Sequence, residues 1–174
     1  ALRSADPGVS RAKALRLASA GFDTVFVATA WAPGLVAPTP DEATVLANVD
    51  TAAAAAGLRI VLRVSHADPA STPLTDGARQ EFARYVTAVL AAHPSVADVV
   101  VGDEPNTART WQPQFNPDRT NASAPAYLLL LQSVYDAVEA ATPAVRVWGG
   151  ALAPRGADRP GAAREAQSPG AFLA

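Results

Sequence analysis

The sequence predicts an α/β protein with a parallel sheet. Two observations lead to this class: segments with helical spacing alternate with short β-branched runs, and the loops from each helix to the next strand are short. Such alternation favours right-handed crossovers between parallel strands. No shift in composition marks a second domain, so we expect residues 1–174 to form one domain of about four βα units.

The first two units each consist of a helix, a glycine and a strand. Residues 10–20 have a helical pattern that stops at the following glycine, and residues 22–28 (FDTVFVA) form a β-branched and aromatic run. Asp41 is expected to cap the second helix, which Gly57 ends. Residues 58–64 (LRIVLRV) are then predicted to form the next strand.

The third and fourth units follow the same order. Thr75 or Asp76 is expected to cap the third helix, and residues 96–101 (VADVVV) form the third predicted strand. A helix over residues 125–141 leads to a fourth strand that begins at residues 145–148. The apolar stripe expected on this last helix consists of Leu128, Leu131, Tyr135 and Val138. All four strands are apolar, as expected when both faces of a sheet are buried.

Composition excludes several classes of function. The net charge is −2 and the basic residues are scattered, so no basic stripe is available for nucleic acid. No run approaches the roughly 20 apolar residues of a membrane span, and the first residues lack the apolar segment of a signal peptide. Cysteine is absent, which excludes disulfides, thiolate nucleophiles and cysteine-based zinc sites.

Chemically active side chains gather just after the predicted strands. In parallel α/β sheets, ligands bind beyond the carboxyl ends of the strands. The residues found at those positions are Trp31, Ser65, His66, Asp68, Asp103, Glu104 and Asn106. We therefore expect the functional site at this end of the sheet.

The third strand carries the most specific motif. Residues 99–106 read VVVGDEPN, and an aromatic loop, WQPQF, follows at residues 111–115. This resembles clan A of the retaining glycoside hydrolases, the cellulase-like and β-glycosidase-like enzymes, in which a barrel strand ends in Gly-Asn-Glu-Pro. The resemblance implies a partial TIM (β/α)8 barrel whose strands look like the second to fifth, since a closed barrel usually needs about 250 residues. It makes Glu104 the catalytic acid/base.

The resemblance also implies a substrate and its contacts. The substrate would be a β-linked oligo- or polysaccharide cleaved with retention and without a cofactor, by a secreted or extracellular bacterial enzyme. The residues expected to contact it are Asp103, His66, Trp31, Asn106 and Trp111. In the family the nucleophile is a glutamate at the end of the seventh strand, which this sequence does not reach. The chain alone is therefore expected to be inactive.

Asp103 departs from the family pattern, which has asparagine before the acid/base. The family's amide contacts the 2-hydroxyl of the sugar, and a carboxylate could still accept a hydrogen bond from that hydroxyl. If the two carboxyl groups lie close together, like-charge repulsion would also favour the protonated form of Glu104. Asp103 is therefore expected either to tune the acid/base or to reduce activity.

Several of these residues have structural interpretations that stay open. Trp31 and Trp111 would either stack on sugar rings or anchor loops, and His66 would either contact the substrate or hydrogen-bond beneath the loops. Trp148 lies inside a strand pattern and is predicted to be core. Arg63 would either point into the barrel or pair with a carboxylate.

Two further functions compete with the glycosidase. Oxygen and imidazole ligands at neighbouring strand ends would suit a metal-dependent barrel enzyme, with His66, Asp68, Asp103 and Glu104 around a divalent cation. Alternatively, the chain would be a carbohydrate-binding remnant without turnover. A sheet limited to these four strands would leave two apolar edges unpaired, at FDTVFVA and at VRVW, so the isolated chain is expected to self-associate or aggregate unless the missing half of the barrel is supplied.

Overall fold

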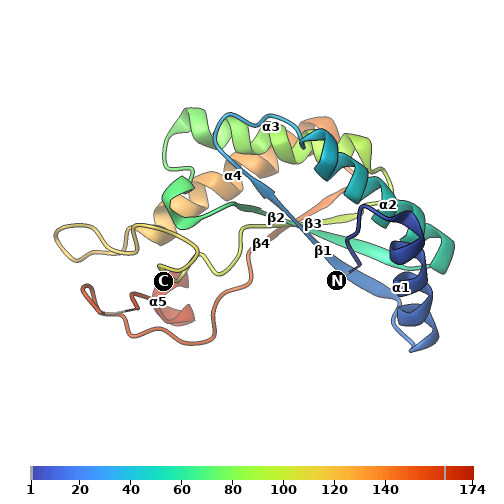
Figure 1. Ribbon diagram of the computed structural model, residues 1–174. Coiled ribbons are helices and arrows are strands. Elements are labelled where there is room, and N and C mark those ends of the chain that lie inside the picture. Colours follow the sequence, from blue (N-terminus) through green and yellow to red (C-terminus); the bar gives the residue numbers. More distant parts are fainter. Residues whose placement is uncertain (1, 163) are drawn as a thin grey trace.

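The computed structural model describes residues 2–162 and 164–174, in which four parallel strands alternate with helices (Figure 1). The strands are β1 (Thr24–Trp31), β2 (Arg59–His66), β3 (Asp98–Val101) and β4 (Arg146–Gly149). The helices are α1 (Pro7–Ser19), α2 (Pro40–Ala56), α3 (Asp76–Ala92), α4 (Ser123–Ala141) and α5 (Pro169–Leu173), with a 3-10 turn at Pro69–Ser71. Each strand pairs in parallel with the next along the chain. The α/β class is confirmed, and the arrangement is consistent with part of a βα-repeat fold.

In α1 and α2, a capping side chain and a proline together mark the first turn of the helix. α1 starts earlier than predicted because the Asp6 carboxylate accepts hydrogen bonds from the first-turn amides and Pro7 occupies the first helical position. In α2 the capping residue is Thr39 rather than Asp41, and Pro40 again follows it. The Thr75 cap of α3 is confirmed.

The first two strands extend beyond their predicted ends. β1 continues to Trp31 and β2 to His66, and these two residues are partners in the parallel register. Both were expected in loops after the strands. Because side chains alternate along a strand, the extension places Trp31 and His66 on the same face as the buried residues Val27 and Val64.

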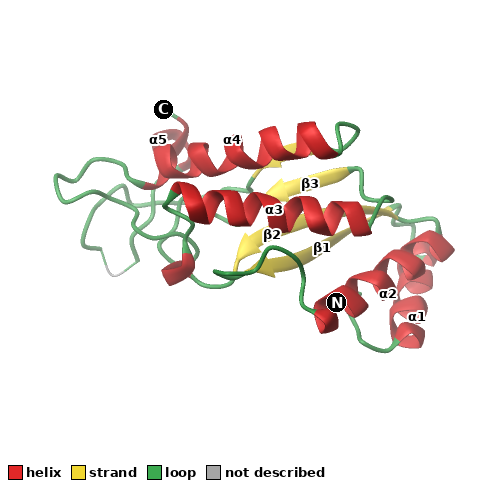
Figure 2. Ribbon diagram, turned by 90° about the horizontal axis from the view of Figure 1, so that it is seen from above, coloured by secondary structure: helices red, strands yellow, loops and turns green. Residues whose placement is uncertain are grey.

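Only one face of the sheet is covered by helices in the described part of the chain, so the expectation that both faces are buried is wrong. α3 and α4 lie over the same face (Figure 2). α2 covers it as well: Val27 of β1 lies beside Leu46 and Val49 of α2 and Val89 of α3. Phe26, the residue before Val27, is 59% exposed on the other face. We call the uncovered side, which carries Phe26, the open face.

The prediction for Trp148 is also wrong, and the predicted apolar stripe on α4 is right at only two of its four positions. Trp148, predicted to be core, points to the open face and is 51% exposed. On α4, Val138 is buried and Leu131 is partly buried, as predicted, whereas Leu128 and Tyr135 are exposed. Tyr127, Leu130 and Val134 are buried instead. The buried residues of α4 have the predicted helical spacing, but the buried stripe is rotated around the helix relative to the predicted one. A helix this rich in leucine offers two overlapping apolar stripes.

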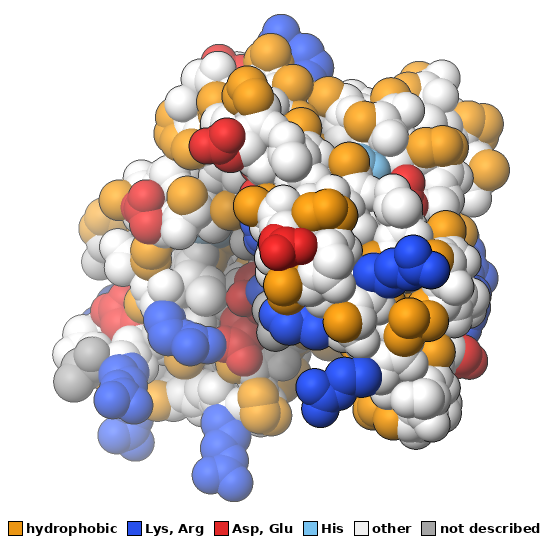
Figure 3. Space-filling view, turned by 45° about the vertical axis from the view of Figure 1, so that its right-hand side comes forward, with side chains coloured by type: hydrophobic (Ala, Val, Ile, Leu, Met, Phe, Trp, Pro, Cys, Tyr) orange, Lys and Arg blue, Asp and Glu red, His pale blue; other side chains and the backbone are white. Residues whose placement is uncertain are grey.

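The remaining surface is mixed in character. Acidic and basic side chains both lie among apolar ones on the face drawn in Figure 3. Within the described residues, no helix combines the length and the apolar character needed to cross a bilayer.

Candidate active site at the carboxyl ends of the strands

Glu104 lies just past the end of β3, in a backbone conformation that residues other than glycine rarely adopt. Gly102 has a φ of 82°, and Glu104 itself has a φ of 43°, in the left-handed region that side chains other than glycine disfavour. The Glu104 amide donates to the Ala151 carbonyl at 2.9 Å, and the Glu104 carbonyl accepts from the Thr110 hydroxyl at 2.6 Å. The surrounding loops therefore hold Glu104 in a conformation that costs about 1 kcal/mol or more.

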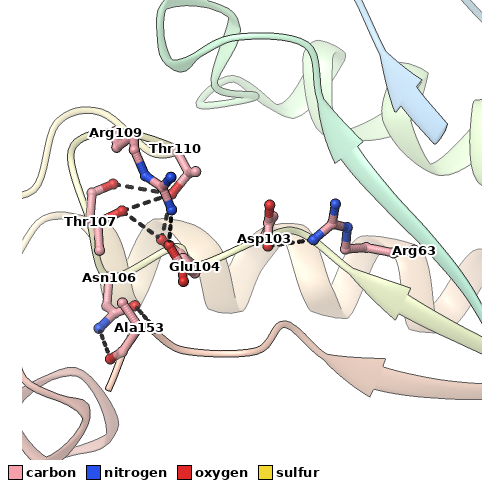
Figure 4. A network of polar contacts seen from close by, with 8 residues as sticks. All are labelled: Arg63, Asp103, Glu104, Asn106, Thr107, Arg109, Thr110 and Ala153. Carbon is pink, nitrogen blue, oxygen red and sulfur yellow. Dashed lines mark hydrogen bonds and ion pairs between the residues drawn. The ribbon is translucent and has the colours of Figure 1, made fainter. Parts of the chain in front are cut away.

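The carboxylates of Asp103 and Glu104 point in opposite directions, each toward its own arginine (Figure 4). Asp103 lies 2.7 Å from the Arg63 guanidinium, and Glu104 pairs with Arg109. Arg63 projects from the open face of β2 and pairs with the Asp103 carboxylate, so it is held by a carboxylate on the uncovered side of the sheet. Because each carboxylate is paired with its own arginine, its charge is compensated locally, which weakens the repulsion by which Asp103 was expected to tune Glu104.

Tyr127, which the sequence did not single out, fastens the ends of β3 and β4 together. Its hydroxyl donates to the Val101 carbonyl at 2.7 Å and accepts a hydrogen bond from the Gly150 amide. Burial raises the pKa of Tyr127 to about 12, so the hydroxyl stays protonated and keeps its donor. A Cβ at Gly102 would lie 3.1 Å from the Tyr127 ring. The glycines that follow β3 and β4 were the feature of the sequence that could have indicated this close contact.

Asn106, expected to contact the substrate, is fully occupied by the chain itself. It is 0% exposed. Its side-chain oxygen accepts from the Ala153 amide at 2.8 Å, and its nitrogen donates to the carbonyls of Ala153 and Gln167 at 2.9 and 2.8 Å. No atom of the amide is left for a sugar. Asn106 instead ties the turn after β3 to the segment that follows β4.

The two tryptophans expected at the site lie in the interior. Trp31 and Trp111 are each 1% exposed, so neither ring offers a face to a sugar. The Trp31 indole N–H donates to the Leu35 carbonyl at 2.9 Å, and its ring packs edge-on against Phe82. Trp111 packs edge-on against His66. Of the two interpretations left open by the sequence, their burial favours loop anchors.

His66 reaches a small cavity at the strand ends while lying mostly buried. The cavity holds about 180 Å³, and Asp103 and Arg109 also line it. His66 Nε2 lies 3.4 Å from the Thr72 hydroxyl, and Nδ1 has no hydrogen-bond partner among the described residues. Burial lowers the pKa of His66 below its ordinary value of 6.5, so the imidazole is neutral at pH 7. The structure thus brings His66, Asp103 and the Glu104–Arg109 pair together.

The buried imidazole predicts a loss of stability on acidification. Because the folded pKa of His66 lies below the unfolded value, protons bind preferentially to the unfolded chain as the pH falls below about 6.5. We expect the urea midpoint to fall between pH 7 and pH 5, and to fall much less in His66→Gln. An unchanged pH dependence in His66→Gln would contradict this account.

A larger cleft lies beside this cavity. It holds about 1470 Å³, and Arg109, which borders the smaller cavity too, is one of its walls. Thr107 and Gln112 line it from the loop after β3, and Arg155 and Glu165 from the segment after β4. Among the described residues, no three His, Asp or Glu side chains lie close enough together to hold a metal ion. No protein-family model matches this chain, and a search of curated proteins finds no relative.

Proposed function

We propose that this chain carries the acid/base part of a retaining β-glycoside hydrolase site, with Glu104 as the acid/base. The observation that supports this most is the backbone of Glu104. A glutamate is kept in the left-handed region at the carboxyl end of a parallel strand, followed by proline, where glycine would cost less. Such strained residues cluster at functional sites, and this end of a parallel sheet is where ligands bind.

The chemistry requires Glu104 to exchange its arginine for the substrate. The glycosidic oxygen leaves poorly until a carboxylic acid protonates it, and the same group then removes a proton from the incoming water. Arg109 is 75% exposed on its side chain, so its ion pair with Glu104 is screened by water and weak. A sugar entering the adjoining cleft can therefore displace Arg109 at little cost.

The second carboxylate in this proposal lies outside residues 1–174. The retaining mechanism needs a nucleophile about 5 to 5.5 Å from the acid/base, on the other side of the sugar. Asp103 lies beside Glu104 in sequence and is held by Arg63, so it does not face Glu104 across a substrate. Asp68 caps the 3-10 turn, where its carboxylate accepts two backbone amides.

The proposal is tested by trapping the covalent intermediate. The natural polypeptide that contains residues 1–174 is incubated with 2-fluoro β-glycosides, and the labelled peptide is located by mass spectrometry. We expect a glycosyl adduct on a carboxylate outside these residues, and no adduct or aryl glycoside hydrolysis when residues 1–174 are tested alone. An adduct on Asp68 or Asp103 would overturn the assignment. Failure of the natural polypeptide to cleave any β-glycoside would overturn the glycosidase proposal itself.

A further inference from the structure

The loop after β3 and the segment after β4 form two walls of the 1470 Å³ cleft, at the carboxyl end of the sheet (Figure 1). Thr107 and Ala166 form an antiparallel bridge between these walls. The Ala108 amide also donates to the Glu165 carbonyl at 2.8 Å. Both walls therefore belong to the described part of the chain, and backbone hydrogen bonds hold them together.

The charged side chains that line this cleft are mainly basic. Three arginines take part, Arg109 from the loop after β3 and Arg155 and Arg164 from the segment after β4. Among the described lining residues the one carboxylate is that of Glu165, which accepts a hydrogen bond from the Gly161 amide. The chain as a whole has a net charge of −2. The cleft is therefore a region of positive charge in an otherwise slightly acidic chain.

Two of the three arginines are available to a ligand. Arg155 and Arg164 are both exposed, and neither forms an ion pair within the described residues. A guanidinium presents its N–H groups as a planar fork that matches the oxygens of a carboxylate or another oxyanion. Such charge-assisted hydrogen bonds are roughly twice as strong as neutral ones. An anionic group on a ligand is therefore the chemistry that fits this cleft.

A neutral sugar would find less to bind here. It offers hydroxyl groups and an apolar ring face, and aromatic side chains supply the flat apolar surface against which such a face packs. None of the described residues that line the cleft is aromatic. Trp31 and Trp111, which the sequence placed at the site, are each 1% exposed. Neutral hydrogen bonds largely replace those made with water, so charge is the main source of selectivity in this cleft.

We propose that the cleft binds an acidic glycan, whose sugar units carry carboxylate or sulfate groups, and that Arg155 and Arg164 select for this charge. The choice of a glycan rests on the proposed glycosidase function, and the inference names the substrate class of that site. Arg109 connects the two regions, because it lines both the cleft and the smaller cavity that His66 and Asp103 border. A glycan in the cleft therefore lies beside the proposed acid/base.

Arg109 would also couple the charge of the glycan to the state of Glu104. A guanidinium close to a carboxylate favours its ionised form, whereas a general acid must carry a proton. An anionic group in the cleft competes with Glu104 for Arg109, and their ion pair is screened by water because the Arg109 side chain is 75% exposed. An acidic glycan thus draws away the cation that keeps Glu104 ionised, which a neutral glycan cannot do.

The test is a calorimetric binding titration, which does not depend on turnover. The natural polypeptide that contains residues 1–174 is titrated with β-1,4-linked trisaccharides whose glycosidic oxygens are replaced by sulfur, so that they resist cleavage. Each is made in the gluco and the manno configuration, in three forms: neutral, oxidised to the carboxylate at C6, and sulfated at O6. We expect one charged form to bind about tenfold or more tightly than its neutral counterpart at about 50 mM salt, and the difference to shrink at about 500 mM. Comparison of the two charged forms identifies the anionic group.

The arginines are tested by a matched pair of variants. Arg155→Gln combined with Arg164→Gln should lose most of the preference for the charged ligand and leave binding of the neutral one unchanged. Arg159→Gln is the control, because Arg159 is exposed in the same segment but does not line the cleft, and it should behave as wild type.

Several results would overturn the inference. These are equal binding of charged and neutral trisaccharides, a preference that persists in the double variant, and equally tight binding of a short single-stranded RNA, which would show a surface that attracts any polyanion. Cleavage of neutral β-glycosides without a preference for charge would reject the acidic ligand and keep the proposed hydrolase. A preference for charge in a polypeptide that cleaves no β-glycoside would support the acidic ligand and reject the hydrolase.

Discussion

Glu104→Gln is expected to lower kcat on an unactivated β-glycoside by at least about 100-fold, the usual contribution of general acid catalysis. The experiment uses the natural polypeptide, because the proposed nucleophile lies outside residues 1–174. Glutamine is close to isosteric and keeps the left-handed backbone, but it has no proton to give. The leaving oxygen would then depart as an alkoxide, which is unfavourable near neutral pH.

The comparison of two substrates isolates the acid role. An aryl glycoside with a good leaving group needs little protonation, so its cleavage step should slow much less in Glu104→Gln. Azide is expected to restore turnover of this substrate by Glu104→Ala, because it can attack the glycosyl intermediate without a general base. Glu139→Gln, on the exposed face of α4, is the control and should behave as wild type. Equal losses on both substrates would contradict the acid role.

Asn106→Ala is expected to destabilise the chain by about 3 kcal/mol or more. The substitution leaves the Ala153 amide and two buried carbonyls, those of Ala153 and Gln167, without their partner. Each buried polar group left unpaired costs about 1–3 kcal/mol. The change should appear as a lower urea midpoint at constant slope. It should also increase proteolysis after β4, since Asn106 fastens that segment.

A matched asparagine separates this role from binding. Asn116 is exposed and bonds to the nearby Thr120 hydroxyl at 3.0 Å, so Asn116→Ala should change the stability by no more than about 0.5 kcal/mol. If Asn106 instead contacted the substrate, Asn106→Ala would raise KM and leave the urea midpoint unchanged. That result would restore the expectation from the sequence and contradict the buried network.

The glutamate turn shows how far sequence reasoning reached at the site. Gly102 and Pro105 on either side of the carboxylates marked the end of a strand, and the structure places Glu104 just past β3. The arginines that pair with the carboxylates could not be predicted from the sequence. Arg63 lies on a neighbouring strand, and nothing local distinguishes it from other arginines that alternate with core residues. Tyr127 was missed because its partners, Val101 and Gly150, are both backbone groups.

The sequence by itself determined the order of helices and strands, the cap at Thr75 and the position of Glu104, because these depend on residues within about one helical turn or strand. Only the tertiary structure decided which side chains are free to act. Trp31 faces the helices because β1 extends to this residue and its alternate side chains point to the covered face. Which face is covered depends on how helices distant in the sequence pack. The Asn106 amide hydrogen-bonds to backbone groups 47 and 61 positions away in the sequence, which leaves it unavailable to a ligand. Contacts over such separations depend on how the units stack, which no local pattern encodes.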